Sequence, residues 1–209
     1  MSDSPRSKPR WASRDPRFPR FRRRKVFGLK WNPFSKKKEQ EPELDPLSDL
    51  SLDRLKVGYI LDYDLESWQV TAHNRYDYDG DWTDEWEIKC AGETRYLERE
   101  EDDEVSWVLY RKIPLDTIEE NVATHILDHE DPPDAVTCDG VRYEAESSDA
   151  GHFHRNQSED GKPFVNWTYV GQTDTQVLLI EQWGESDFEA SLGDVVQPYQ
   201  FSNILPGAS

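Results

Sequence analysis

The stretch WEIKCAGETRYLE, residues 86–98, indicates the fold class of this chain. Two short runs, 86–90 and 95–98, combine aromatic and branched apolar residues with charged ones. Gly92 stands between them, where a turn is expected. This arrangement predicts two antiparallel strands joined by a tight connection, which is a β-hairpin.

A second stretch, WTYVGQTDTQVLLIE at residues 167–181, has a similar pattern. Trp86 matches Trp167 at an offset of 81 residues, and Glu98 matches Glu181 at an offset of 83. One interpretation is a weak internal repeat, in which each half of the chain forms one antiparallel meander. The other interpretation is that hairpins rich in aromatic residues simply resemble one another.

The rest of the chain after residue 52 favours the same class of structure. Leu115, Ile118, Val122 and Ile126 recur at helical spacing, so one helix is expected over 115–130. The predicted fold is mainly β, with antiparallel meanders that form a sandwich or barrel-like body around one intervening helix. Further strands are expected at 57–63, 68–72, 105–112, 136–138, 142–146, 151–154, 164–170 and 177–183.

Charge divides the chain into a basic arm and an acidic body. Residues 1–38 hold 14 basic and two acidic residues, a net charge of +12, and five prolines, so this arm is predicted to be disordered. Residues 39–52 form an acidic linker. The β-rich domain is expected over 53–205, with 53–113 and 134–205 as its two halves. Residues 39–209 carry a net charge of −30, which is typical of proteins from salt-accumulating organisms.

Composition excludes several classes of protein. The 209 residues include 25 aromatic ones, which favours a folded core, and two cysteines, which exclude a disulfide framework. No apolar run approaches the roughly 18 residues that a membrane span needs, and the first residues lack the apolar stretch of a secretory signal. We expect a cytoplasmic protein, with peripheral attachment to a membrane as an option.

Few residue patterns in the chain point to catalysis. No glycine-rich phosphate loop, dinucleotide fingerprint or nucleophile elbow is present. Cys90 and Cys138 stand apart and suit small buried side chains. Two histidine pairs are the weak metal candidates, His125 with His129 on one helix face and His152 with His154 on one strand face. We therefore expect no cofactor and no enzymatic activity, with a metal-dependent regulator as the rival interpretation.

Short motifs follow one another in a fixed order over about residues 53–205. They are Leu55-Lys56-Val57-Gly58, Trp68-Gln69-Val70, Trp82-Thr83-Asp84-Glu85-Trp86-Glu87-Ile88, Tyr96-Leu97-Glu98, Val141-Arg142-Tyr143, Leu179-Ile180-Glu181-Gln182-Trp183 and Leu192-Gly193-Asp194-Val195-Val196. This ordered set resembles the bacterial domain of unknown function family numbered 4178. The basic arm lies outside this resemblance.

The resemblance implies no established activity. It implies an accessory role, because relatives are associated with genes for enzymes similar to those of polyamine synthesis and for membrane-stress proteins. An enzyme accessory to polyamine-type metabolism is thus a further alternative. The residues singled out within the family-like motifs are Trp82, Glu85, Trp86, Glu181, Trp183 and Gly193.

Structural roles are expected for several of these side chains. Glu85 and Glu181 each lie near a tryptophan, so each carboxylate is expected to bond to a neighbouring hairpin backbone or to an indole N–H. An exposed sheet face is expected to carry the aromatic residues that select a partner, with at least half of them in the core instead. Those aromatic residues are Tyr76, Tyr78, Trp82 and Trp183.

The arm is the best candidate for contact with a partner. Basic residues alternate there with aromatic ones, which suits an anionic membrane surface, a protein partner or, less well, nucleic acid. The acidic body would repel nucleic acid. The remaining interpretation is that the arm is a tail without a function. The predicted function is a binding or adaptor module. The residues expected to make the contact are Arg22, Arg23, Arg24, Lys25, Phe27, Trp31, Phe34, Lys36, Lys37 and Lys38.

Overall fold

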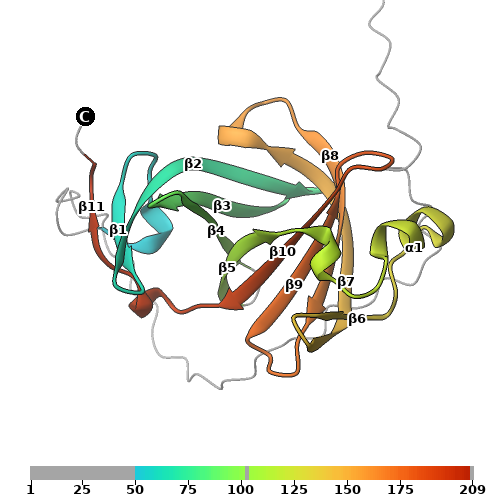
Figure 1. Cartoon of the computed structure of the whole chain (residues 1–209). Helices are drawn as coiled ribbons and strands as arrows, with labels where there is room; N and C mark the ends of the chain where they lie inside the picture. The colour runs from blue at the N-terminus through green and yellow to red at the C-terminus, as the bar shows by residue number, and fades with distance from the viewer. Residues whose placement is uncertain (1–49, 102–103, 208–209) are drawn as a thin grey trace, which may run out of the picture.

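A computed structural model describes residues 50–101 and 104–207 of the chain (Figure 1). Its strands form one antiparallel sheet, and a single α-helix lies between the fifth and sixth strands. Four short 3₁₀ turns complete the described part. The strands are β1 (Ile60–Tyr63), β2 (Glu66–Tyr78), β3 (Asp81–Cys90), β4 (Glu93–Glu101), β5 (Val105–Ile113), β6 (Ala135–Cys138), β7 (Val141–His154), β8 (Lys162–Val170), β9 (Gln176–Gln182), β10 (Phe188–Val195) and β11 (Ser202–Leu205). The helix is α1 (Val122–His129), and the turns are η2 (Leu52–Arg54), η3 (Leu115–Thr117), η4 (Arg155–Gln157) and η5 (Pro198–Gln200).

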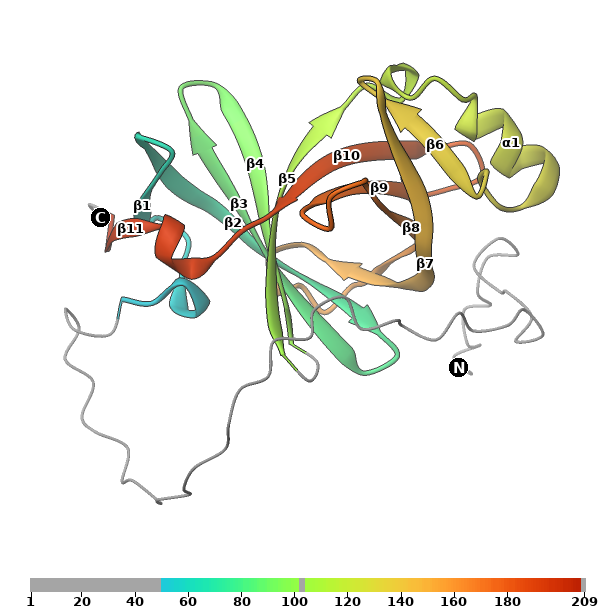
Figure 2. The ribbon, with the colours of Figure 1, turned by 90° about the horizontal axis from the view of Figure 1, so that it is seen from below.

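The sheet closes on itself. Its strand order is β11-β1-β2-β3-β4-β5-β10-β9-β8-β7-β6, and β2 pairs additionally with β7. Eight strands, from β2 round to β7, therefore form a closed ring, which Figure 2 shows from below. Strands β1 and β11 continue the sheet beside β2, and β6 does so beside β7. The predicted fold class is confirmed, and of the two predicted arrangements it is the barrel-like one.

The ring closes over three residue pairs. Arg75, Tyr76 and Asp77 of β2 lie opposite residues 152–154 of β7. Gly151 precedes this contact, and a Cβ atom added to it would lie 2.4 Å from the carbonyl oxygen of Asp77. Since real Cβ atoms do not approach a backbone oxygen so closely, only glycine fits where the two strands cross.

The two halves of the ring share one arrangement. Strands β1–β5 and β6–β10 follow each other in the same order, and each second strand is long, at 13 and 14 residues. Glu98 lies opposite Glu85, as Glu181 lies opposite Asn166. Where β5 meets β10, Arg111 lies opposite Leu192, which is 81 positions further along the chain. This is the same offset as that between Trp86 and Trp167. The register therefore has a pseudo-twofold axis at this seam, and it supports the predicted repeat.

Apolar residues lie mainly on the outer face of the ring, in two separate clusters. The first cluster contains Trp86 and Leu97 and is covered by Leu52, Leu55 and Phe201, which come from the two ends of the described chain. The second cluster contains Trp167 and Ile180, which occupy the matching positions of the second half. It is covered by Val122 and Ile126 of α1. Each half therefore needs its own covering segment to bury its outer face.

The helix is shorter than the predicted 115–130. It spans Val122–His129 and begins at Asn121, whose side chain accepts a hydrogen bond from the amide N–H of Thr124 at 3.2 Å. The residues before it cannot join the helix, because Ile118 is extended and pairs with Cys138 in an isolated bridge. The apolar spacing from 115 to 126 thus reflects one shared core rather than one continuous helix.

The strand predictions differ from the structure in several ways. Strand β11 was not predicted, and β2 extends from Glu66 to Tyr78 instead of over the predicted 68–72. The runs predicted at 142–146 and 151–154 belong to one strand, β7, which bends at an irregular register between Ala145 and Ser147. Strand β10 was not predicted, because FEASLGDV lacks the usual apolar alternation. It forms because β5 and β9 pair with it on both sides. Among the described residues, no helix is long and apolar enough to cross a membrane.

Ring closure can be tested by replacing Gly151 with alanine. The added Cβ collides with the backbone of Asp77, so the free energy of unfolding should fall by about 1–3 kcal/mol. Gly184→Ala is the matched control, because its Cβ would meet nothing closer than 3.6 Å. Chemical denaturation of both variants measures the difference, and equal stability would contradict the closure described above.

Candidate functional site inside the ring

The inner face of the ring combines a small apolar cluster, which contains Tyr110, Val177 and Leu179, with an unusual number of polar residues. Residues that pair directly across strands lie on the same face of a sheet, so Asn74, Glu85 and Glu98 share one face, as do Asn166 and Glu181. Contacts that cross the ring show that this face points inward. The Tyr76 hydroxyl on β2 reaches Glu181 on β9 at 3.4 Å. We call the following residues the inner polar cluster: Asn74, Tyr76, Tyr78, Glu85, Glu98, Lys112, Asn166 and Glu181.

Lys112 and Glu181 form the ion pair of this cluster. The Lys112 ammonium donates to Glu181 at 2.9 Å and to Glu189, at the rim, at 2.5 Å. The Glu181 side chain is 1% exposed, whereas that of Lys112 is 38% exposed. Burial opposes the charge of Lys112, but the two carboxylates outweigh it and raise its pKa. Burial raises the pKa of Glu181, and Lys112 counteracts part of that rise.

Glu85 is held by hydrogen bonds to neutral groups. The Asn74 amide donates to Oε1 of Glu85 at 2.8 Å, and the Tyr76 hydroxyl lies 3.1 Å from Oε2. These donors do not fully replace water, so burial raises the pKa of Glu85 to about 7. Burial, and then the charge of Glu181, raises the pKa of Tyr76. Glu85 therefore changes charge near neutral pH inside the ring.

Glu98 is the third inner glutamate. Within the part of the chain that the structure describes, no hydrogen bond or ion pair reaches its carboxyl group. Burial is the main cause of its strongly raised pKa, followed by repulsion from Glu85. Also on the inner face, Asn166 donates to the Tyr78 hydroxyl at 3.1 Å, while Oδ1 of Asn166 is buried without a hydrogen-bond partner. The inner face thus contains two acceptors without a donor from the described residues, the Glu98 carboxyl group and Asn166 Oδ1.

An open pocket lies at one end of the ring, next to the ion pair. It measures about 420 Å³ and includes Tyr96, Lys112, Leu115, Phe188 and Glu189 in its lining. The Lys112 ammonium lies 5.5 Å from the centre of the Tyr96 ring. The protein thus surrounds its own ammonium group with carboxylates and an aromatic ring.

The residues singled out in the family-like motifs do not form one site, because Glu85, Glu181 and Gly193 lie inside the ring and two of the three tryptophans do not. Trp86 is buried on the outer face, where its indole N–H donates to the backbone oxygen of Leu55 at 3.0 Å. Trp82 is 40% exposed, and the guanidinium of Arg75 lies 4.3 Å from its ring centre. Gly193 lies inside, because a Cβ there would be 2.6 Å from the Tyr110 ring.

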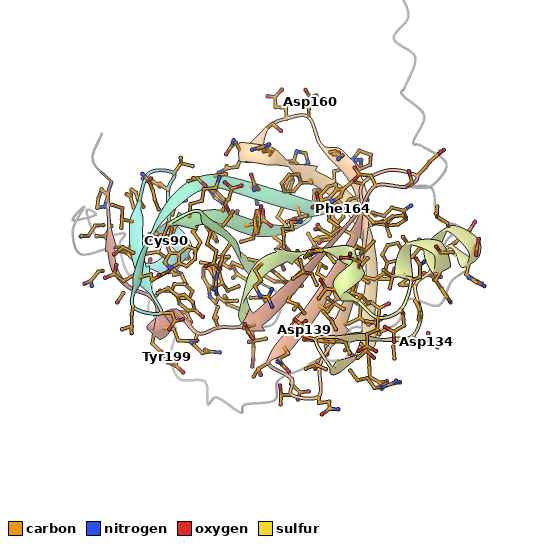
Figure 3. The ribbon with its side chains drawn as sticks, viewed as in Figure 1. Cys90, Asp134, Asp139, Asp160, Phe164 and Tyr199 are labelled. Atoms are coloured by element: carbon orange, nitrogen blue, oxygen red, sulfur yellow. The ribbon has the colours of Figure 1, made fainter. Side chains whose placement is uncertain are left out.

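Most of the four aromatic residues considered for an exposed sheet face are covered, in line with the expectation that at least half of them pack in the core. Tyr76 is only 4% exposed and, with Tyr78, belongs to the inner polar cluster. Trp183 is partly exposed, and its ring packs on the ring of Phe164. Figure 3 labels Phe164. Only Trp82 of the four expected aromatic residues is exposed. Side chains alternate between the two faces of β2, and one of these faces points into the closed ring. Tyr76 and Tyr78 lie on that inner face.

The partners of Glu85 and Glu181 also differ from the prediction. Among the described residues, neither carboxylate accepts a hydrogen bond from a backbone amide or an indole; side chains of other strands hold them instead. The sequence missed Lys112, Asn74 and Asn166 as site residues. Glu98 was found only as the repeat partner of Glu181. Finding the others requires the register between β5, β10 and β9, which no local pattern contains.

The histidine and cysteine candidates do not form a metal centre. The rings of His125 and His129 stack at 4.3 Å, and each bonds to a backbone oxygen. His152 and His154 lie on β7, where His154 bonds to the backbone oxygen of Ser158. Over residues 50–101 and 104–207, no group of three or more metal-ligating side chains is close enough to hold an ion. Cys138 is buried and Cys90 is partly exposed, and both are free thiols. The arm residues from Arg22 to Lys38 lie outside the described residues.

The fold and its inner cluster define a class of protein: a closed antiparallel ring of eight strands with an acidic interior. The chain belongs to the family described as a domain of unknown function, DUF4178, whose model matches residues 56–198. It is similar to an uncharacterized protein of Aquifex aeolicus (strain VF5), at 29% identity over 169 residues, which is 81% of this chain and 93% of the relative. No solved structure matches the chain.

The raised pKa of Glu85 makes stability depend on pH. The folded state holds this proton up to about pH 7, whereas the unfolded chain releases it near 4.5. The contribution of Glu85 to the free energy of unfolding is therefore present below pH 4.5 and lost by about pH 7, a change on the order of 3 kcal/mol.

Glu85→Gln should remove this dependence, so the variant gains stability relative to the natural chain between pH 4.5 and 8. Denaturant titrations at several pH values measure it. Glu144→Gln, at a side chain that is 71% exposed, is the control and should leave the pH dependence unchanged. Parallel pH profiles for Glu85→Gln and the natural chain would refute the assignment.

Loss of the Lys112 ammonium leaves Glu181 buried without a counter-charge. We expect Lys112→Met to lower the free energy of unfolding by about 2–3 kcal/mol at pH 8, after allowance for the partial exposure of Lys112. The double variant Lys112→Met/Glu181→Gln should recover most of that loss. Lys89→Met, at an exposed pair with Glu87, should cost about 0.5 kcal/mol or less.

Proposed function

We propose that the protein is a non-enzymatic binding module that attaches to an anionic membrane surface through residues 1–38. The basic and aromatic residues of this arm make the contact, and the ring is the body that the arm positions. Support comes from the division of charge, +12 on residues 1–38 and −30 on the remainder. Opposite charges of this size favour contact of one end of the chain with an anionic surface.

The body has an apolar end that supports this orientation. Five of its exposed large apolar residues lie on β1, on β11 or beside them. Leu65 is fully exposed at the β1–β2 turn, and Tyr199, which Figure 3 labels, is 84% exposed in η5. Leu52, close to the first described residue, packs in the same cluster as Phe201. The chain thus enters the body beside its apolar end. The remaining exposed residues of this end are Val57, Ile60 and Leu205.

The two kinds of contact respond differently to salt. Each arginine or lysine near an anionic surface contributes about 1 kcal/mol at moderate salt, and near-molar salt shortens the Debye length to about 3 Å. Insertion of Phe27, Trp31 and Phe34 depends on apolar burial, which salt does not weaken. The acidic parts of the body are repelled by the same surface, so only its apolar end approaches the membrane and the rest remains free to bind another molecule.

Sedimentation of the full chain with vesicles tests this function. We expect binding to vesicles that contain phosphatidylserine and weak binding to neutral phosphatidylcholine. Replacing Arg22, Arg23, Arg24 and Lys25 with alanine should reduce binding at low salt by about tenfold or more, since four favourable charges are lost. Replacing Phe27, Trp31 and Phe34 with alanine should remove the binding that persists in high salt.

Leu127→Ser is the control for the apolar end, because Leu127 is 56% exposed but lies on α1. It should bind as the natural chain does, whereas Leu65→Ser should bind more weakly. If the full chain does not sediment with anionic vesicles, the membrane function is wrong and a protein partner of the arm becomes the leading alternative. If the full chain binds nucleic acid and the variant with the four basic substitutions does not, the arm functions in nucleic-acid binding instead.

A further inference from the structure

The pseudo-twofold axis of the ring makes its two inner glutamates directly comparable. Glu98 and Glu181 occupy matching positions on β4 and β9. The axis passes through the Arg111–Leu192 pair, where β5 meets β10. A rotation about this axis exchanges the two neighbouring pairs, which are Lys112–Ser191 and Tyr110–Gly193. Lys112 of the first half therefore matches Gly193 of the second.

This comparison reveals a missing partner. Lys112 crosses the seam from β5 and gives Glu181 an ammonium at 2.9 Å. The matching residue that would cross from β10 to Glu98 is Gly193, which has no side chain. Glu98 consequently has no hydrogen bond or ion pair to any described residue. The repeat gives one glutamate a cation from the chain and leaves the other without one.

Other groups on this side of the ring also lack donors. Oδ1 of Asn166 is buried without a hydrogen-bond partner, and Asn166 is only 7% exposed. Its Nδ2 donates to the Tyr78 hydroxyl, and Glu98 is close enough to Tyr78 to raise its pKa. Glu98 and Tyr78 each keep part of their surface accessible, so solvent reaches this side of the interior. A group that enters here can reach the carboxyl group of Glu98.

We propose that the ring binds the primary ammonium group of a small molecule at Glu98, which lacks the lysine partner that Glu181 has in the other half. The Glu98 carboxylate accepts one N–H of this ammonium group. The rings of Tyr78 and Tyr110 supply aromatic surface, as Tyr96 does for Lys112. A group with N–H donors suits this carboxylate better than a simple metal ion, since no cluster of three metal ligands exists in the described part. This inference does not depend on the membrane function.

Methylammonium is the probe, because it carries the same head group as a lysine side chain. We expect it to raise the Tm of the full chain relative to potassium chloride and tetramethylammonium chloride at equal ionic strength. Burial raises the pKa of the Glu98 carboxyl group, so a proton and an ammonium group compete for it. Apparent affinity should then increase with pH, until methylammonium itself loses its proton.

Two variants make the test decisive. Glu98→Gln should weaken methylammonium binding by about tenfold or more, while Glu93→Gln, at an exposed position of the same strand, should not change it. Lys112→Ala removes the ammonium of Glu181, and methylammonium should restore its Tm. An unchanged Tm in the natural chain, an equal effect of potassium, or full binding by Glu98→Gln would each overturn the proposal. Rescue of Lys112→Ala without any effect on the natural chain would overturn it as well.

Discussion

The pairing of β2 with β7 is the constraint on which the rest of the structure depends. It converts an open sheet into a closed ring, and it does so over three residue pairs beside Gly151. Once the ring is closed, every second residue of its strands must point inward. The polar residues Asn74, Glu85, Glu98 and Glu181 therefore come to lie inside, although nothing in their own strands requires them to be buried.

Closure also explains where the apolar residues lie. The inner face already contains glutamates and tyrosines, so the larger apolar clusters are on the outside and need covering. The first half is covered by η2 and by residues after β10, and the second by α1. The two halves thus share one strand order but differ in what covers them. They differ again inside, where Lys112 balances Glu181 and Gly193 leaves Glu98 without a counter-charge.

The sequence predicted the class of fold better than it predicted the site. Alternation and turns gave a mainly β body with two similar halves, and the match of Trp86 with Trp167 agrees with the register. Local patterns could not show which face of β2 is buried, because Tyr76 and Tyr78 alternate with Arg75 and Asp77 in a way that suits an exposed face equally well. Only the long-range pairing decides between them. For the same reason, Lys112 was not found as the partner of Glu181, which is 69 residues away.

The ring itself can be tested most directly by nuclear Overhauser effects between β2 and β7. Opposed residues of antiparallel strands lie about 4.5–5.5 Å apart at their Cα atoms, which brings backbone protons within range. A closed ring predicts backbone contacts between residues 75–77 and residues 152–154. An open sheet, in which these residues show contacts only to β3 and β8, would contradict the polar interior and everything inferred from it.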